Sequence, residues 1–127
     1  MWYSYAIIRV VPRVERGEFV NVGVIVYVPE SAFLAARVEL SCTRLETMLR
    51  GIGSEEVERR LAAIVGVAAG DVTCGPMAAM PASERFHWLT APRSTVIQTS
   101  LPHDGRTDDP LGEVERLMDA FVRVSDE

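Results

Sequence analysis

FVNVGVIVYV, residues 19–28, is the stretch that decides the fold. Alternate positions of this stretch are all valine: Val20, Val22, Val24, Val26 and Val28. β-branched residues at a period of two predict a strand whose alternate side chains point to one face. We therefore expect this valine face to pack against the hydrophobic core. The opposite face is mixed, with the polar Asn21 among apolar neighbours, and part of it should also be covered.

The segments on either side of this stretch extend the sheet. Residues 3–11 are also rich in β-branched and aromatic types, and the short polar stretch 12–18 between the two segments predicts a hairpin. The alternation at residues 36–40 predicts a third strand. Residues 85–89 and 95–100 predict two more strands.

Capping patterns predict the helices. Thr43 followed by Glu46 predicts a short helix. Ser54, ahead of two glutamates and an apolar repeat at helical spacing, predicts a longer helix. Asp109 and Pro110 have the residue types of an N-cap and a first helical position, so a final helix should begin there.

The order of these elements gives the fold class. Three strands, two helices, two strands and a helix follow one another without the regular strand-helix alternation of a parallel sheet. Turn-forming residues predict an irregular crossing at residues 71–83 and a polar loop at residues 102–109. The sequence thus predicts one α+β domain over residues 1–127, with a small, mostly antiparallel sheet of about five strands and helices packed on one face.

The composition excludes several classes of function. The net charge is -5, which repels phosphate backbones, so we expect no nucleic-acid partner. All 13 basic residues are arginine, which excludes Schiff-base chemistry and a GxxxxGK[ST] phosphate loop. The spacing of Cys42 and Cys74 fits neither a disulfide framework nor a metal cluster, so we expect no metal and no cofactor. No apolar run reaches membrane-spanning length and no signal peptide is evident, which predicts a cytoplasmic protein without a membrane partner.

The first cluster of candidate ligand-binding residues surrounds Arg9, with Glu18 and Asn21 nearby. Arg9 shares a strand face with tyrosines, and a guanidinium beside aromatic rings can hold an anionic group. The alternative is an internal pair between Arg9 and Glu18 or a backbone carbonyl. Asn21 in mid-strand requires a specific hydrogen bond, because asparagine is unfavourable there.

Two further clusters lie toward the C-terminus. Arg93, Ser94 and Gln98 belong to the predicted final hairpin. Ser94 with His87 and a carboxylate could form a hydrolytic set, although no nucleophile elbow or oxyanion motif supports it. In the loop at residues 103–109, a histidine and three aspartates could bind a cation, and a solvated acidic loop is the alternative.

Three stretches resemble a known family. YAIIRVVPRVERGEFVNVGVIV at residues 5–26, RFHWLTAPRSTVIQTS at residues 85–100 and TDDP at residues 107–110 are similar to the bacterial domain-of-unknown-function family 3037. The resemblance covers nearly the whole chain. It implies no assigned activity, and it implies that a HipA-type kinase is often encoded beside the gene. The positions that match the family pattern are Arg9, Pro12, Glu18, Asn21, Gly23, Phe86, Pro92, Ser94 and Gln98.

The preferred functional hypothesis is a non-enzymatic interaction or accessory protein. It would bind a protein partner, such as a HipA-like kinase, or a second copy of itself. Helices that pack only on the valine face would leave the apolar side of the first hairpin free for such a partner. The candidate interface residues are Tyr3, Tyr5, Ile7, Phe19, Ile25 and Tyr27.

The second hypothesis is a small enzyme or ligand-binding protein for an anionic or nucleotide-like compound. It requires several polar side chains to converge in one pocket. These candidates are Arg9, Asn21, Arg93, Ser94 and Gln98, with Glu18 beside them. The sequence contains no recognisable catalytic set, which favours the interaction protein over the enzyme.

Overall fold

The computed structural model describes residues 1–12, 16–40, 54–93 and 95–123. Its strands are β1 (Trp2–Val10), β2 (Val20–Val28), β3 (Phe33–Val38), β4 (Ile97–Thr99) and β5 (His103–Arg106). Its helices are α2 (Ser54–Ala69), α3 (Ala82–Leu89) and α4 (Pro110–Phe121), with short 3-10 helices η2 (Pro29–Ser31), η3 (Val72–Cys74) and η4 (Pro76–Ala79). The helix predicted from Thr43 and Glu46 lies outside the described residues.

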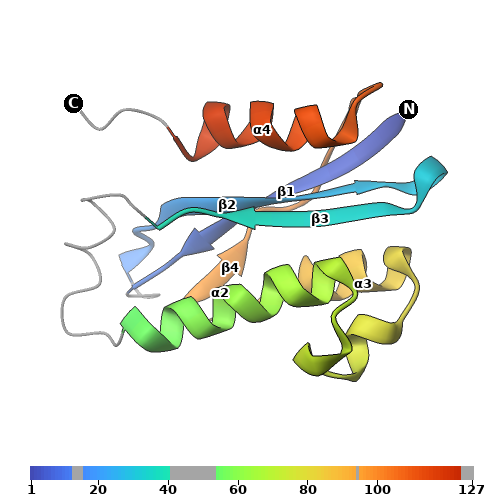
Figure 1. Ribbon diagram of the computed structural model, residues 1–127. Helices are drawn as coiled ribbons and strands as arrows, with labels where there is room; N and C mark the ends of the chain where they lie inside the picture. Colours follow the sequence, from blue (N-terminus) through green and yellow to red (C-terminus); the bar gives the residue numbers. More distant parts are fainter. Residues whose placement is uncertain (13–15, 41–53, 94, 124–127) are drawn as a thin grey trace.

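The strands form one antiparallel sheet (Figure 1). β3 pairs with β2, and β2 pairs with β1. The other edge of β1 has two partners, since β4 pairs with residues 8–10 and β5 pairs with residues 2–5. The prediction of an α+β fold on an antiparallel sheet of about five strands is therefore confirmed.

The prediction that the helices pack on one face is wrong. α4 covers one face of the sheet, here called the α4 face, and α2 and α3 cover the other, the α2/α3 face (Figure 1). The core on the α4 face contains Ile7, Leu117 and Met118, and the core on the α2/α3 face contains Ile8 and Leu61. Neighbouring residues of β1 thus serve different cores, because successive side chains of a strand point to opposite faces.

A β-bulge in β2 lets that strand contribute to both cores. Ile8 of β1 lies opposite Gly23, but the next residue, Arg9, lies opposite Asn21, so Val22 has no partner of its own on β1. An extra residue of this kind shifts the pairing by one position. Because side chains alternate with a period of two, the shift reverses the face to which the later residues point.

The bulge divides the valines of β2 between the two faces. Val20 and Val22 belong to the core on the α2/α3 face. The other three valines belong to the core on the α4 face: Val24, Val26 and Val28. The prediction of a single valine face is wrong because it assumed a regular strand, although every one of these valines is buried.

Gly23 at the bulge allows β3 to approach closely. A Cβ atom at this position would lie 2.3 Å from the Arg37 carbonyl oxygen and 2.9 Å from Cγ2 of Val38. The backbone oxygen cannot move without displacing β3. Glycine is therefore required here by the spacing between β2 and β3.

Two predicted elements have a different structure. Residues 85–89 are the end of α3 and not a strand, and its buried residues Phe86 and Leu89 have the spacing of a helix face. Residues 103–106, predicted as part of a loop, form β5. Residues 71–81 are irregular as predicted, with η3 and η4 in place of longer elements, but residues 82 and 83 already belong to α3.

Other predictions agree with the structure. The helix predicted to start at Ser54 is α2. Asp109 accepts a hydrogen bond from the Gly112 amide, and Pro110 opens α4. The third strand is present, although it begins earlier than predicted, at Phe33. Among the described helices, none is long and apolar enough to cross a membrane.

A buried hydrogen-bond cluster holds the start of α4 against β1. The Tyr3 hydroxyl donates to Glu113 Oε2 at 2.6 Å, and Arg116 Nε donates to the same oxygen at 2.7 Å. Burial alone would raise the pKa of Glu113, but the hydrogen bonds from Arg116 and Tyr3 outweigh it and lower the pKa. The Glu113 carboxylate is thus kept charged by the donors that bond to its Oε2.

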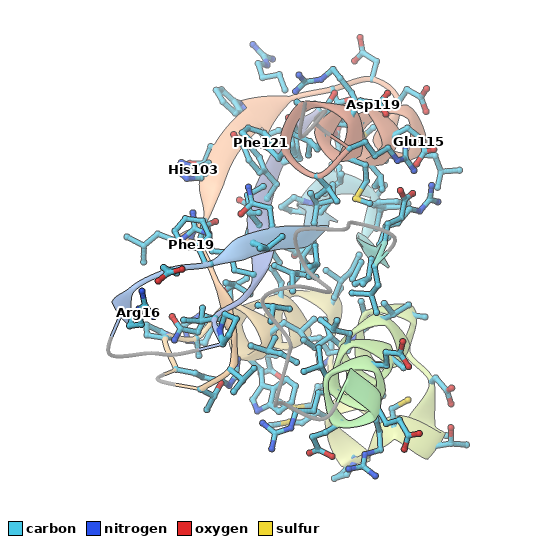
Figure 2. All side chains as sticks on the ribbon, turned by 90° about the vertical axis from the view of Figure 1, so that its left-hand side faces the viewer. Arg16, Phe19, His103, Glu115, Asp119 and Phe121 are labelled. Atoms are coloured by element: carbon cyan, nitrogen blue, oxygen red, sulfur yellow. The ribbon has the colours of Figure 1, made fainter. Side chains whose placement is uncertain are left out.

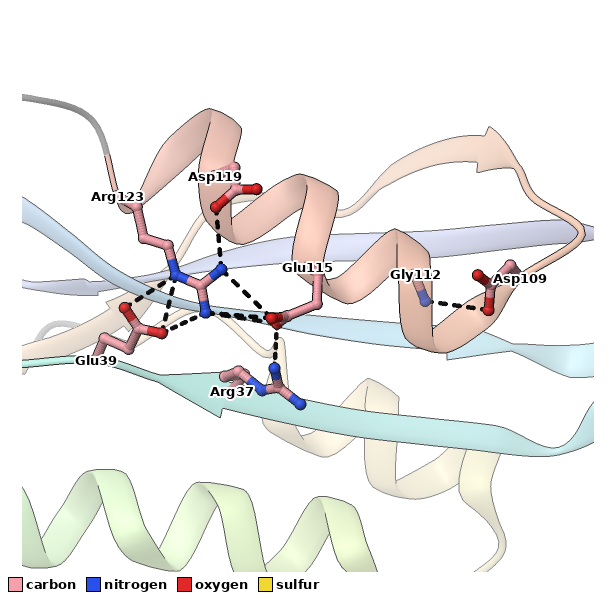
Figure 3. Close-up of polar contacts among 7 residues, drawn as sticks. All are labelled: Arg37, Glu39, Asp109, Gly112, Glu115, Asp119 and Arg123. Atoms are coloured by element: carbon pink, nitrogen blue, oxygen red, sulfur yellow. Dashed lines mark hydrogen bonds and ion pairs between the residues drawn. The ribbon is translucent and has the colours of Figure 1, made fainter.

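A second set of contacts holds the end of α4 against β3 (Figure 3). Arg123 Nε donates to Glu39 Oε2 at 2.9 Å, and its Nη1 donates to Asp119 Oδ1 at 3.0 Å. Glu115 lies between Arg123 and Arg37 and pairs with both. Exposed ion pairs of this kind contribute little individually, but a shared network fixes the position of the helix.

We predict that Gly23→Ala destabilises the protein by about 1–3 kcal/mol, the usual cost of overpacking a well-packed site. Chemical denaturation measures the loss. Gly17→Ala is a contrasting variant, because a Cβ there meets no atom within 4 Å and its cost comes from the positive φ of 70° at that residue. A Gly23→Ala protein as stable as the wild type would contradict the close approach of β3.

We also predict that Tyr3→Phe lowers the free energy of unfolding at neutral pH by about 1–3 kcal/mol, because buried Glu113 loses a donor. Burial and the neighbouring Glu113 raise the pKa of Tyr3 from 10.0 to about 12. The folded protein therefore holds this proton more tightly, and the resulting stability is complete below pH 10 and lost toward pH 12.

Urea denaturation between these pH values tests the prediction. The wild type should lose stability more steeply than Tyr3→Phe. Tyr27→Phe is a matched control, because the Tyr27 hydroxyl is not bonded to Glu113 or Arg116. In this variant the free energy of unfolding should fall with pH as steeply as in the wild type. Equal slopes in the wild type and Tyr3→Phe would show that the Tyr3 hydroxyl is not bonded to Glu113.

Candidate functional site

A cavity of about 290 Å³ lies between α2, α3 and β4. Its lining is mostly apolar, with polar groups contributed by β4 and by the segment before it. The described lining residues are Arg60, Ala63, Ile64, Val67, Cys74, Trp88, Leu89, Arg93, Thr95, Ile97, Gln98 and Thr99. A concave, apolar site with a few convergent polar groups is the usual form of a small-molecule site.

Two arginines give the cavity a positive rim. The Arg93 guanidinium donates to the carbonyl oxygens of Trp88 at 2.7 Å and Leu89 at 3.2 Å, and so holds the end of α3. Its central carbon lies 5.0 Å from the centroid of the Trp88 ring. Arg60 donates to Glu56 at 2.9 Å, and Glu56 also pairs with Arg59. One carboxylate thus serves two guanidinium groups.

The polar groups of β4 differ in how they are satisfied. Gln98 Nε2 donates to the Thr95 carbonyl at 3.0 Å, and Thr95 Oγ1 donates to the Ile97 carbonyl at 2.6 Å, so both stabilise the turn before β4. Thr99 Oγ1 is buried and has no hydrogen-bond partner among the described residues. Buried unsatisfied hydroxyls are uncommon in native proteins. Thr99 is therefore a lining residue whose hydroxyl has unused hydrogen-bonding capacity among the described residues.

Cys74 reaches the cavity because Gly66 leaves room for it. A Cβ on Gly66 would lie 2.2 Å from the Cys74 sulfur. The thiol donates to Asp71 at 3.8 Å, and hydrogen bonds from Thr73 to the Asp71 carboxylate lower the pKa of Asp71. Neither histidine of the chain belongs to the described lining. The lining thus offers no histidine to act as a general base for the thiol.

Arg9, Asn21 and Gln98 lie side by side in a row across three strands. Arg9 pairs with Asn21 on β2 and with Gln98 on β4. Asn21 Nδ2 donates to the Phe121 carbonyl at 3.1 Å, which is the specific hydrogen bond expected for a mid-strand asparagine. Arg9 Nε and Asn21 Oδ1 are buried without a hydrogen-bond partner among the described residues. Arg9 and Asn21 are not part of the described cavity lining, so the predicted residues do not converge in one pocket.

The other predicted polar residues lie elsewhere. Glu18 pairs with Arg16, with 2.8 Å between Oε1 and Nε, and Arg9 stacks on Phe19 in place of the predicted pair with Glu18. His87 is exposed on α3. Ser94 lies outside the described residues.

The aspartates of residues 103–109 have separate roles. Asp104 accepts a hydrogen bond from Ser4 Oγ at 2.9 Å, Asp108 lies 3.6 Å from the N-terminal ammonium, and Asp109 caps α4. Across the described ranges, no three potential metal ligands lie close enough together to hold an ion.

The predicted interface residues do not form an uncovered surface. Tyr3 and Ile7 are buried under α4. Ile25 is buried on the α2/α3 face, where the Tyr27 ring also packs, 5.3 Å from the ring of Phe86. The expectation that one side of the hairpin stays free is therefore wrong, because α4 returns across it.

Phe19 is the exposed member of that predicted interface, and Tyr5 is half-buried. The Tyr5 ring packs against His103 and Phe121, with centroids 5.4 and 6.1 Å away. Phe19 is 40% exposed, and the Arg9 guanidinium lies 4.3 Å from its ring centroid. Figure 2 shows Phe19 on the same side of the molecule as His103 and Phe121.

Sequence reasoning missed several cavity residues. Arg60, Ala63 and Ile64 were visible only as part of an amphipathic helix, and Thr99 only as part of a strand. Thr99 lies opposite the buried Ile8 and therefore faces the α2/α3 core. A polar residue at a position that faces the core was a usable signal for a site.

Comparison with known proteins gives one match. The family model described as "Protein of unknown function (DUF3037)" matches residues 5–122. No curated protein and no solved structure matches the chain at a significant level.

We predict that Thr99→Val stabilises the unliganded protein by about 1 kcal/mol, because it removes a buried hydroxyl that has no partner and keeps the side-chain shape. Thermal and chemical unfolding measure the change. Thr90→Val is the control, because Thr90 Oγ1 donates to the Phe86 carbonyl at 2.8 Å, and this change should destabilise. A destabilised Thr99→Val protein would mean that the Thr99 hydroxyl is already bonded.

Proposed function

The chain belongs to the DUF3037 family, whose description assigns no activity, and from the cavity we propose that it is a binding protein for a small molecule. The ligand has an apolar body and one anionic group, such as a carboxylate. The anionic class is the one that the sequence suggested, although only Arg93 and Gln98 of the described candidates line the cavity.

The single observation that carries this proposal is the combination of an apolar cavity with an arginine rim. The volume of about 290 Å³ equals roughly ten water molecules at about 30 Å³ each, which suits a compact ligand. Apolar residues such as Ile64 and Leu89 favour a hydrocarbon or aromatic body. Arg60 and Arg93 favour a negative charge at the rim.

Binding is favoured over catalysis by the chemistry of the lining. Cys74 is the one classical nucleophile of strong intrinsic reactivity among the described lining residues, and its thiol already donates to Asp71. Arg93 and Gln98 are engaged with backbone carbonyls. Such groups position a ligand well, but they transfer no proton at neutral pH.

Octanoate is a suitable probe, with octanol as its uncharged counterpart. Trp88 lines the cavity, so its fluorescence should change on binding, and Trp2→Phe removes the signal of the other tryptophan. We expect octanoate to bind with a Kd in the micromolar to millimolar range, typical of a ligand of this size. Octanol should bind more weakly, because it cannot pair with the arginines.

A matched pair of α2 variants locates the site. Ala63→Phe places a ring in the cavity and should abolish octanoate binding, whereas Ala62→Phe adds the same ring to an exposed position outside the described lining and should leave binding unchanged. Equal affinity for octanoate and octanol would contradict the anionic ligand. Binding that survives Ala63→Phe in a folded protein would contradict the cavity as the site.

A further inference from the structure

The strand β5 forms an edge of the sheet that no other described strand covers. The Thr107 amide donates to the Met1 carbonyl at 2.8 Å, and Tyr3 lies opposite Gly105 in the same register. Hydrogen-bonded and non-hydrogen-bonded pairs alternate along an antiparallel ladder. Gly105 therefore directs its amide and carbonyl toward β1, while Asp104 and Arg106 direct theirs away from the sheet.

The two residues with outward backbone groups carry opposite charges. Asp104 and Arg106 are both exposed and, being two positions apart on a strand, they lie on the same face. The Asp104 carboxylate is held by Ser4 Oγ at 2.9 Å. The Arg106 guanidinium lies 4.8 Å from the centroid of the Trp2 ring. Both charged groups are thus held in place beside the edge.

We propose that β5 pairs with β5 of a second copy of this chain, antiparallel and about a two-fold axis at Gly105. In this register Asp104 of one copy lies opposite Arg106 of the other. Each such pair exchanges two backbone hydrogen bonds and also brings a carboxylate beside a guanidinium. The symmetry repeats the contact on the other side of the axis, so the five-stranded sheets join into one continuous sheet.

Charge complementarity is what identifies the occupant as a second copy. An exposed edge is commonly protected by charges of one sign, which repel an identical edge. Here the sequence HDGR places opposite charges symmetrically about Gly105, so an identical edge is attracted. Trp2, which is 62% exposed, lies beside this contact and would shield the ion pairs from water. The edge of β5 shares no residue with the described lining of the cavity.

A charge-swap experiment tests the contact. Analytical ultracentrifugation of the full chain, from micromolar to sub-millimolar concentrations, should show a reversible dimer. Asp104→Arg and Arg106→Asp each place like charges opposite one another and should weaken dimerisation about tenfold or more. The double variant Asp104→Arg/Arg106→Asp restores opposite charges and should restore the dimer. Circular dichroism checks that every variant is folded.

Amide hydrogen exchange gives an independent readout. The amides of Asp104 and Arg106 should exchange rapidly at low protein concentration and become protected as the dimer forms, whereas the Gly105 amide should be protected at both concentrations. A wild type that is monomeric at every concentration would overturn the proposal. So would a dimer that the single charge changes do not weaken, or a folded double variant that stays monomeric.

Discussion

The bulge at Val22 and Gly23 is the constraint on which the rest of the structure depends. It reverses the faces of β2 near the start of the strand, so that one hydrophobic strand supplies side chains to two cores. Without it, all five valines would point to one face. Because the bulge places Val24, Val26 and Val28 on the second face, that face also needs a cover, and α4 packs on it after the sheet is complete.

The two faces of the sheet have different structural roles. On the α4 face, the helix is fastened at both ends, by Tyr3 and Glu113 at its start and by Arg123 and Glu39 at its end. On the α2/α3 face, the helices leave a cavity beside the short strand β4. Sheets covered on both faces need apolar residues at consecutive positions, which explains the long apolar runs of β1 and β2.

Much of the fold could be predicted from the sequence. The two long strands, α2 and the start of α4 are encoded locally, by alternation and by capping residues such as Asp109. The bulge could not be predicted, because a regular valine repeat gives no local sign of a shift in pairing. β5 was missed for a related reason. HDGR has poor strand propensity, and it is a strand because β1 offers it backbone partners.

The site was only partly predictable. Arg93 and Gln98 were identified, and both line the cavity. Arg9 and Asn21 were grouped with them, but neither belongs to the described lining of the cavity, and the Asn21 side chain donates to the Phe121 carbonyl at the end of α4. Whether two residues of a sheet are neighbours depends on the register between their strands and on the face to which each side chain points. Neither can be read directly from the sequence. Because residues 85–89 were predicted as a strand, the sequence also did not indicate that Trp88 belongs to a helix and lines the cavity.

Having two cores on one sheet has a consequence for how the molecule opens. Val114, Leu117 and Met118 belong to the core on the α4 face, and no α4 residue belongs to the described lining of the cavity. Local opening of part of a fold costs less free energy than global unfolding. Local opening of α4 would therefore expose the core on one face of the sheet, while the cavity lies on the other face.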